Sequence, residues 1–176
     1  MRKKAALHNL GCKVNAYETE AMRQLLEEAG YEIVPFEPGA DVYVINTCTV
    51  TNIADRKSRQ MLHRARKMNP DAVVVATGCY VETSDGAAKK DPAIDIVLGN
   101  NRKGELLTVL GEYEEHRREK GYKEAFTDKI DINHTKEYEN LQISRSEART
   151  RADIKVQDGC NQFCTYCIIP FARGRV

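Results

Sequence analysis

The stretch that decides the fold reads Pro70-Asp71-Ala72-Val73-Val74-Val75-Ala76-Thr77-Gly78-Cys79. Its centre, residues 72–76, is a continuous run of small and β-branched apolar residues, with turn residues on either side. A short apolar run bounded in this way predicts a strand that is buried on both faces. Such strands are typical of parallel sheets, so this run favours an α/β fold.

The order of strand, cysteine and helix recurs along the chain. Apolar periodicity predicts strands over 4–10, 31–36, 41–46, 72–76 and 94–98, and helices over about 16–29, 52–68, 84–90 and 103–113. This alternation implies an open, mostly parallel sheet with helices on both faces, joined by right-handed crossovers.

The composition is that of a globular protein, with 41% hydrophobic and 30% charged residues among 176. A net charge of +1 excludes a global field that would draw the chain to nucleic acid or to a membrane surface. The apolar run behind Met1-Arg2-Lys3-Lys4 is too short for a signal peptide, and no run is long enough to span a membrane. We therefore expect a cytoplasmic protein with reduced cysteines, which in clusters more often bind metal or catalyse reactions.

Residues 114–145 differ from the rest of the chain, with dense mixed charge and few apolar residues. We interpret them as a linker, or as irregular strands that wrap the first domain with Phe126 and residues 130–132 as anchors. Residues 152–156 alternate like a strand and lead into Cys160. The predicted organisation is an α/β domain over 1–113, a charged segment over 114–145 and the start of a second domain over 146–176.

Three cysteines follow predicted strands directly: Cys12, Cys48 and Cys79, here called the edge cysteines. The carboxyl ends of parallel strands form the ligand crevice, and neighbouring strands lie about 4.8 Å apart, so these side chains can converge on one metal or cluster. Free cysteines are also common as small buried hydrophobic residues. A redox-active thiol pair is a further alternative.

A second set, here called the loop cysteines, lies in Asp158-Gly159-Cys160-Asn161-Gln162-Phe163-Cys164-Thr165-Tyr166-Cys167. Their steps of four and three residues suit one metal centre, and three thiolates leave a tetrahedral iron or zinc one ligand short. A structural zinc knuckle is the alternative, but it needs a fourth ligand, and the nearest histidine is His134 in the charged segment. The spacing resembles the signature of the radical S-adenosylmethionine enzymes, in which the open iron of a [4Fe-4S] cluster binds the cofactor.

Further motifs surround both sets of cysteines. They are Gly11-Cys12-Lys13-Val14-Asn15 with Glu18 and Glu20, Asn46-Thr47-Cys48-Thr49-Val50, Gly78-Cys79, the stretch from Val156 to Pro170, and Ala172-Arg173-Gly174-Arg175. Together they resemble the methylthiotransferases, radical S-adenosylmethionine enzymes that insert sulfur and a methyl group into a C–H bond. The resemblance implies that the edge cysteines hold an auxiliary [4Fe-4S] cluster that handles the sulfur. It also implies that the loop cysteines hold the cluster that cleaves S-adenosylmethionine, with Tyr166 near the adenine.

The residues around the cysteines resemble those of the branch of the family that modifies threonylcarbamoyladenosine beside the tRNA anticodon. Other branches act on isopentenyladenosine in tRNA or on a ribosomal-protein aspartate. Family members continue into a radical-enzyme barrel and a small RNA-binding domain, whereas this chain ends at Val176. The resemblance thus implies an amino-terminal portion, with the first strand and cluster loop of a truncated barrel, which is inactive alone. Its implied partners are tRNA, bound mainly by the missing carboxyl-terminal domains, and a cellular electron donor, with no membrane.

Two other classes of protein fit the cysteine pattern. An iron-sulfur electron-transfer module would carry clusters without cleaving the cofactor, and a zinc-stabilised α/β binding domain would carry zinc instead.

The predicted helix over 52–68 is strongly basic, with Arg56, Lys57, Arg59, His63, Arg64, Arg66 and Lys67 against Asp55 alone. A basic run on an amphipathic helix is commonly a solvated surface, but it also suits contact with tRNA phosphates. The candidate residues for such a contact are Arg59, Arg64 and Lys67.

Overall fold

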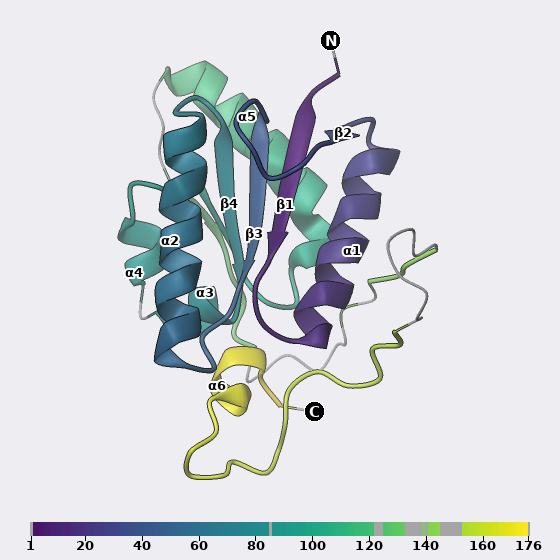
Figure 1. Ribbon diagram of the computed structural model, residues 1–176, viewed down its shortest axis with the longest axis vertical. Helices are drawn as coiled ribbons and strands as arrows, with labels where there is room; N and C mark the ends of the chain where they lie inside the picture. Colours follow the sequence, from purple (N-terminus) through teal and green to yellow (C-terminus); the bar gives the residue numbers. More distant parts are fainter. Residues whose placement is uncertain are drawn as a thin grey trace.

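A six-stranded parallel sheet forms the centre of the molecule (Figure 1). The computed structural model describes residues 2–84, 86–121, 125–132, 139, 141–144 and 153–175. The strands are β1 (Lys4–Asn9), β2 (Glu32–Ile33), β3 (Val42–Thr47), β4 (Val73–Gly78), β5 (Ile96–Leu98) and β6 (Phe126–Asp128). They lie in the order β2-β1-β3-β4-β5-β6, and every neighbouring pair is parallel. The α/β class and the parallel sheet are thus confirmed.

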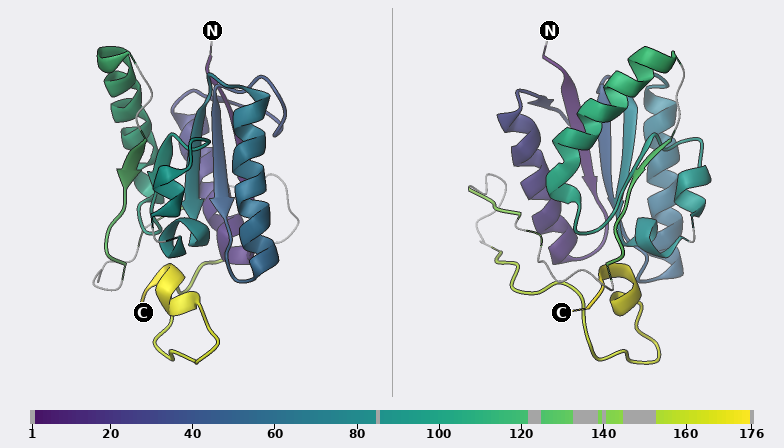
Figure 2. Two further views of the ribbon diagram at one scale, coloured as in Figure 1. Left: turned by 90° about the vertical axis from the view of Figure 1, so that its left-hand side faces the viewer. Right: turned by 180° about the vertical axis from the view of Figure 1, so that it is seen from behind.

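Helices cover both faces of the sheet. They are α1 (Lys13–Glu28), α2 (Asn52–Met68), α3 (Cys79–Thr83), α4 (Ala87–Lys90), the 3-10 turn η1 (Lys103–Glu105), α5 (Leu106–Lys120) and α6 (Ile169–Arg173). The α1 and α5 helices pack into one apolar core, whereas α2, α3 and α4 pack into the other (Figure 2). Within the described ranges, no helix is long and apolar enough to cross a membrane.

The central strands explain this two-sided arrangement. All six residues of β3 and all six of β4 are buried. Along β3, Val42 and Val44 face the α1 and α5 core, while Tyr43 and Ile45 face the α2 core. Because successive side chains of a strand point to opposite faces, a continuous apolar run is what a strand between two helical layers requires.

Several predicted bounds were wrong. The last helix of the first unit continues to Lys120 rather than ending near residue 113. In the segment interpreted as a linker or as irregular wrapping strands, β6 pairs with β5, which agrees with the second alternative and with Phe126 as an anchor. Within the predicted helix over 84–90, the structure has the short helix α4 over Ala87–Lys90, and a further short helix, α3, comes before that range and begins at Cys79. The predicted boundary near residue 145 lies outside the described residues.

The strand predicted over 152–156 does not form in its described residues, 153–156. Ile154 and Val156 are 83% and 86% exposed, whereas the ammonium group of Lys155 is turned inward to an ion pair. The alternation is real, but its apolar side faces outward, so these residues have no apolar face to bury against the sheet. Ala152 lies outside the described residues.

Gly78, at the turn from β4 into α3, provides a test of this fold. Its φ is +95°, and a Cβ there would overlap the Thr47 backbone. Gly78→Ala is therefore expected to lower the free energy of unfolding by about 2–4 kcal/mol, from backbone strain and overpacking together. Urea denaturation followed by circular dichroism measures this loss.

Gly111→Ala is the matched control, because Gly111 lies inside α5 and a Cβ there meets nothing within 4 Å. This variant is expected to gain up to about 1 kcal/mol from helix propensity. Equal unfolding midpoints for the two variants would show that the turn at Gly78 tolerates a side chain.

Candidate functional site

The edge cysteines lie where the sequence places them, at the carboxyl edge of the sheet. Cys12 follows β1 and caps α1, Cys48 follows β3, and Cys79 follows β4. Cys48 and Cys79 are 3% and 2% exposed, while Cys12 is exposed. The chain leaves β1 toward β2 and then returns to β3 on its other side, so the topological switch point lies between β1 and β3. Ligands of open α/β sheets bind at this point.

Local contacts bring the ends of these strands together. Gly11 has φ +105°, and a Cβ on it would lie 2.8 Å from Cys48 Sγ, so the loop after β1 passes directly against Cys48. Ser58 of α2 fixes Cys48, since its Oγ accepts from the Cys48 amide at 3.0 Å and donates to the Cys48 carbonyl at 2.8 Å. Asn15 Nδ2 donates to the carbonyl of Thr47 at 2.9 Å, which ties the start of α1 to the end of β3.

The electrostatic surroundings of Cys79 are mixed. Burial raises the pKa of its thiol above the ordinary value, and the cations of Arg173 and Lys103 oppose that rise. The Cys48 thiol adds to the rise in the Cys79 pKa. A site with cations beside buried thiols favours a thiolate more than an apolar core does.

The donor set fits a thiolate-bound metal cluster. Soft thiolates are the ligands that iron-sulfur clusters and zinc prefer, and Asn46 Oδ1 and Thr77 Oγ1 lie buried without hydrogen-bond partners near the ends of β3 and β4. In the part of the chain that the structure describes, no three His, Cys, Asp or Glu side chains lie close enough to hold a metal ion. The three thiols thus lie along one edge of the sheet, and the described residues do not form a metal-coordination geometry.

The loop cysteines lie beyond the same edge, in the yellow loop that precedes α6 (Figure 1). Cys164 is exposed, and Cys160 and Cys167 are partly buried. The Cys167 amide donates to the Cys164 carbonyl at 2.9 Å, which closes the turn between them. Tyr166 is 93% exposed, so its predicted place beside an adenine is not formed by the described residues.

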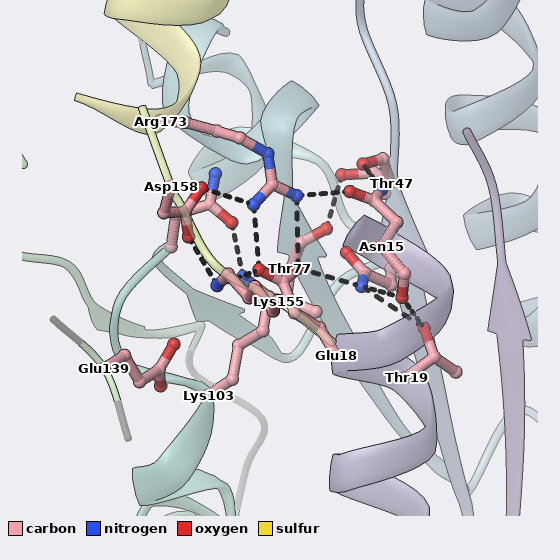
Figure 3. A network of polar contacts seen from close by, with 12 residues as sticks. Asn15, Glu18, Thr19, Thr47, Thr77, Lys103, Glu139, Lys155, Asp158 and Arg173 are labelled. Carbon is pink, nitrogen blue, oxygen red and sulfur yellow. Dashed lines mark hydrogen bonds and ion pairs between the residues drawn. The ribbon is translucent and has the colours of Figure 1, made fainter. Parts of the chain in front are cut away.

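Between the two sets lies a buried network of charges (Figure 3). Glu18, Asp158 and Arg173 stand in the motifs quoted from the sequence, but sequence reasoning did not predict that they meet. The centre of the network is Glu18 of α1, which is completely buried. Its carboxylate contacts Lys155 at 2.9 Å, Arg173 at 2.8 Å and Lys103 at 3.2 Å. Asp158 pairs with Lys155 at 2.5 Å and with Arg173 at 2.8 Å. One signal was available, since Glu18 precedes the buried Ala21 and Met22 by three and four residues on the same helix face.

The three cations determine the charge state of Glu18. Burial alone would raise the pKa of this carboxyl, but Lys103, Arg173 and Lys155 hold it far below its ordinary value. Burial likewise acts to lower the pKa of Arg173, and its contacts with Glu18 and Asp158 more than offset this effect. Glu18 is therefore ionised at neutral pH, as the acceptor for three buried donors.

The basic residues of α2 separate into two groups. Arg66 is engaged within the fold, with its guanidinium on the buried carboxylate of Asp95. Arg59 pairs with Asp55 at 2.9 Å on the surface. Arg64 and Lys67 are exposed on the same helix. Of the three candidates for phosphate contact, Arg64 and Lys67 are thus exposed and Arg59 is an exposed residue in an ion pair.

The described residues thus form a parallel α/β domain with thiols and cations at its carboxyl edge. Residues 4–99 match the Uncharacterized protein family UPF0004, and the chain belongs to this family. Two similar relatives are named threonylcarbamoyladenosine tRNA methylthiotransferase MtaB. The one from Bacillus subtilis (strain 168) is 50% identical over 169 residues, which cover 96% of this chain and 36% of the relative. The one from Aquifex aeolicus (strain VF5) is 45% identical over 174 residues, which cover 98% and 41%.

A further relative has a name that describes a different tRNA substrate. The tRNA-2-methylthio-N(6)-dimethylallyladenosine synthase of Moorella thermoacetica is 33% identical over 181 residues, which cover 99% of this chain and 39% of the relative. The chain thus spans roughly two fifths of the length of these curated relatives.

Proposed function

We propose that this chain is part of a tRNA-modifying enzyme that inserts a methylthio group at carbon 2 of threonylcarbamoyladenosine beside the anticodon. The observation that carries the proposal is 50% identity to the Bacillus relative over 96% of the chain. The placement of three cysteines at one sheet edge supports it, because sulfur insertion needs a sulfur-binding site apart from the site of radical formation. The second candidate substrate is dimethylallyladenosine in tRNA, which the weaker likeness to the Moorella enzyme favours.

Under this proposal the edge cysteines hold an auxiliary [4Fe-4S] cluster, and the loop cysteines hold the [4Fe-4S] cluster that binds S-adenosylmethionine. When bound, these groups supply the electron that splits the sulfonium and the sulfur for the substrate, and a cellular donor returns the electron. The protein's own part is to supply thiolates, to exclude water and to hold the two sets of cysteines near each other. Tyr166 is proposed to lie against the adenine in the complete enzyme.

Iron content tests this proposal. After anaerobic reconstitution, the chain is expected to hold about eight irons and eight sulfides, since each of two [4Fe-4S] clusters contributes four. Iron and sulfide analysis with Mössbauer spectra provides the measurement. A content of about four irons would indicate a single cluster. A colourless protein that contains zinc would favour a zinc-stabilised binding domain.

Cleavage of S-adenosylmethionine distinguishes the proposed enzyme from an iron-sulfur electron-transfer module. The full-length enzyme is expected to form 5′-deoxyadenosine from S-adenosylmethionine, whereas an electron-transfer module would carry both clusters without doing so. Nucleoside analysis of tRNA from a deletion strain then identifies the modified base. The 176 residues alone are expected not to methylthiolate tRNA, because they correspond to 36% of the Bacillus relative.

The basic surface of α2 is proposed to contact tRNA phosphates. Replacing Arg59, Arg64 and Lys67 together by alanine in the full-length enzyme is expected to reduce the slope of log K against log salt by about one for each phosphate that is no longer neutralised. Salt-dependent tRNA binding measures the slope. Lys89→Ala with Lys90→Ala, on the exposed end of α4, is the control and is expected to keep the wild-type slope. An unchanged slope in the α2 variant would make that face ordinary solvated surface.

A further inference from the structure

The short helix α6 is fixed under the carboxyl edge of the sheet (Figure 1). Asn100 Nδ2 donates to the carbonyl of Ala172 at 2.6 Å. A Cβ on Gly174 would overlap the Ile132 carbonyl, so the chain passes close against that residue. Between these two contacts stands Arg173, which is 8% exposed although it carries a full charge.

Arg173 is held by Glu18 in a two-pronged contact. Its two terminal nitrogen atoms lie 2.8 and 3.1 Å from the two carboxylate oxygens (Figure 3). A planar guanidinium matched to a carboxylate in this way has one favoured orientation, which an ammonium group does not have. Glu18 therefore fixes the direction of the Arg173 side chain as well as its charge.

The same guanidinium reaches the edge cysteines. The helix that carries it, α6, packs against α3, which begins at Cys79, and its positive charge opposes the rise in the Cys79 pKa that burial causes. The guanidinium also donates to Asn15 Oδ1. That amide oxygen lies 3.7 Å from the thiol of Cys12, and the amide nitrogen of Asn15 holds the carbonyl of Thr47 beside Cys48. A displacement of Arg173 would thus change the surroundings of all three edge cysteines.

The loop cysteines are attached through the same residue. Arg173 donates to Asp158 Oδ1 at 2.8 Å, and the Cys160 amide donates to the Gly174 carbonyl at 3.0 Å. Between these ends, residues 161–166 are exposed. Contacts of Arg173 and its neighbour therefore fix where the loop begins and ends relative to the sheet.

We infer that Arg173 is a positioning residue shared by both sets of cysteines. Anchored by Glu18, it holds α6 and the loop cysteines against the carboxyl edge of the sheet, beside the start of α3 at Cys79. The inference deepens the proposed function, on which it rests in treating the edge cysteines as ligands. Removing one partner from a buried ion network of this kind is costly, because the remaining charges stay buried without their counter-ions.

The test uses the reduced, metal-free chain of 176 residues. Iodoacetamide labelling with peptide mass spectrometry measures the alkylation rate at Cys79, and hydrogen exchange measures the protection of the Cys160 amide. Arg173→Met removes the charge and keeps much of the stem, so local opening is expected to raise both rates by at least about tenfold. Arg173→Lys retains the charge without the two-pronged contact, and is expected to recover only part of the protection. The matched control is Arg175→Met, because Arg175 is exposed over the Phe163 ring, and it is expected to keep wild-type rates.

Protection of the β4 amides reports whether the fold is intact. If Arg173→Met loses it, Asp158→Asn replaces that variant, and its Cys160 amide is expected to exchange about threefold faster than in the wild type. A wild-type rate at Cys79 in folded Arg173→Met, or a wild-type rate at Cys160 in Asp158→Asn, would overturn the inference. So would equal rates in Arg173→Met and Arg173→Lys. Failure of the proposed function appears separately, in the iron content of the unmodified chain.

Discussion

Cys164→Ala is expected to abolish both cleavage of S-adenosylmethionine and methylthiolation in the full-length enzyme, whereas Cys48→Ala is expected to abolish methylthiolation alone. Cys164 stands in the loop set, proposed to hold the cluster that binds the cofactor. Cys48 is a buried edge cysteine, proposed to hold the auxiliary cluster. Losing a ligand should cost more than the roughly 100-fold that loss of an outer partner costs, so each affected activity is expected to fall to background.

Liquid chromatography of 5′-deoxyadenosine and of digested tRNA nucleosides measures the two activities in one reaction. In the 176-residue chain, each variant is also expected to keep about four irons, because only one cluster is lost. Ser58→Ala is a useful companion, since it removes the hydroxyl that fixes the Cys48 backbone and leaves the thiol in place. If Cys48→Ala still formed methylthiolated product, the edge cysteines would not be the residues that handle the sulfur.

The position of the edge cysteines was easier to predict from the sequence than the position of β6. The position of the edge cysteines followed from the sequence because β3 and β4 are buried along their whole length, and a continuous apolar run predicts such strands. For the three-residue β6, the sequence offered only irregular strands with Phe126 as an anchor, and neither its bounds nor its pairing, because a run that short carries no periodicity of its own. Its place in the sheet depends on pairing with β5.

The segment before the loop cysteines shows a different limit. Alternation gives the period of a strand but does not say which side faces the protein. Lys155 turns inward because Glu18 offers a buried carboxylate from a residue 137 positions away, and Ile154 and Val156 turn outward as a consequence. Arg173 lies 155 positions from Glu18, so no local pattern reveals that the two meet. The sequence alone shows only that α1 carries a charged residue, Glu18, on the face that its apolar residues predict to be buried.

That charge leads to the second large effect. Glu18→Gln is expected to lower the free energy of unfolding by about 3–5 kcal/mol, because it leaves buried cations without their shared counter-ion. The loss is a large part of the roughly 5–15 kcal/mol that stabilises a typical domain. Urea denaturation at neutral pH measures it. Glu20→Gln is the matched control on the same helix, because Glu20 is partly exposed and pairs with a single cation, Arg23, so its loss is expected to be only about 1 kcal/mol.

The same residue sets a pH dependence. The folded-state pKa of Glu18 lies far below its ordinary value of 4.5, because three cations outweigh the cost of burial. Its contribution is therefore present in full above 4.5 and is lost progressively as the pH falls toward the folded-state pKa, where protonation removes the counter-ion. The difference in unfolding free energy between the wild type and Glu18→Gln should accordingly narrow as the pH is lowered below 4.5. A difference that stays constant down to acid denaturation would mean that the carboxylate charge does not stabilise the fold.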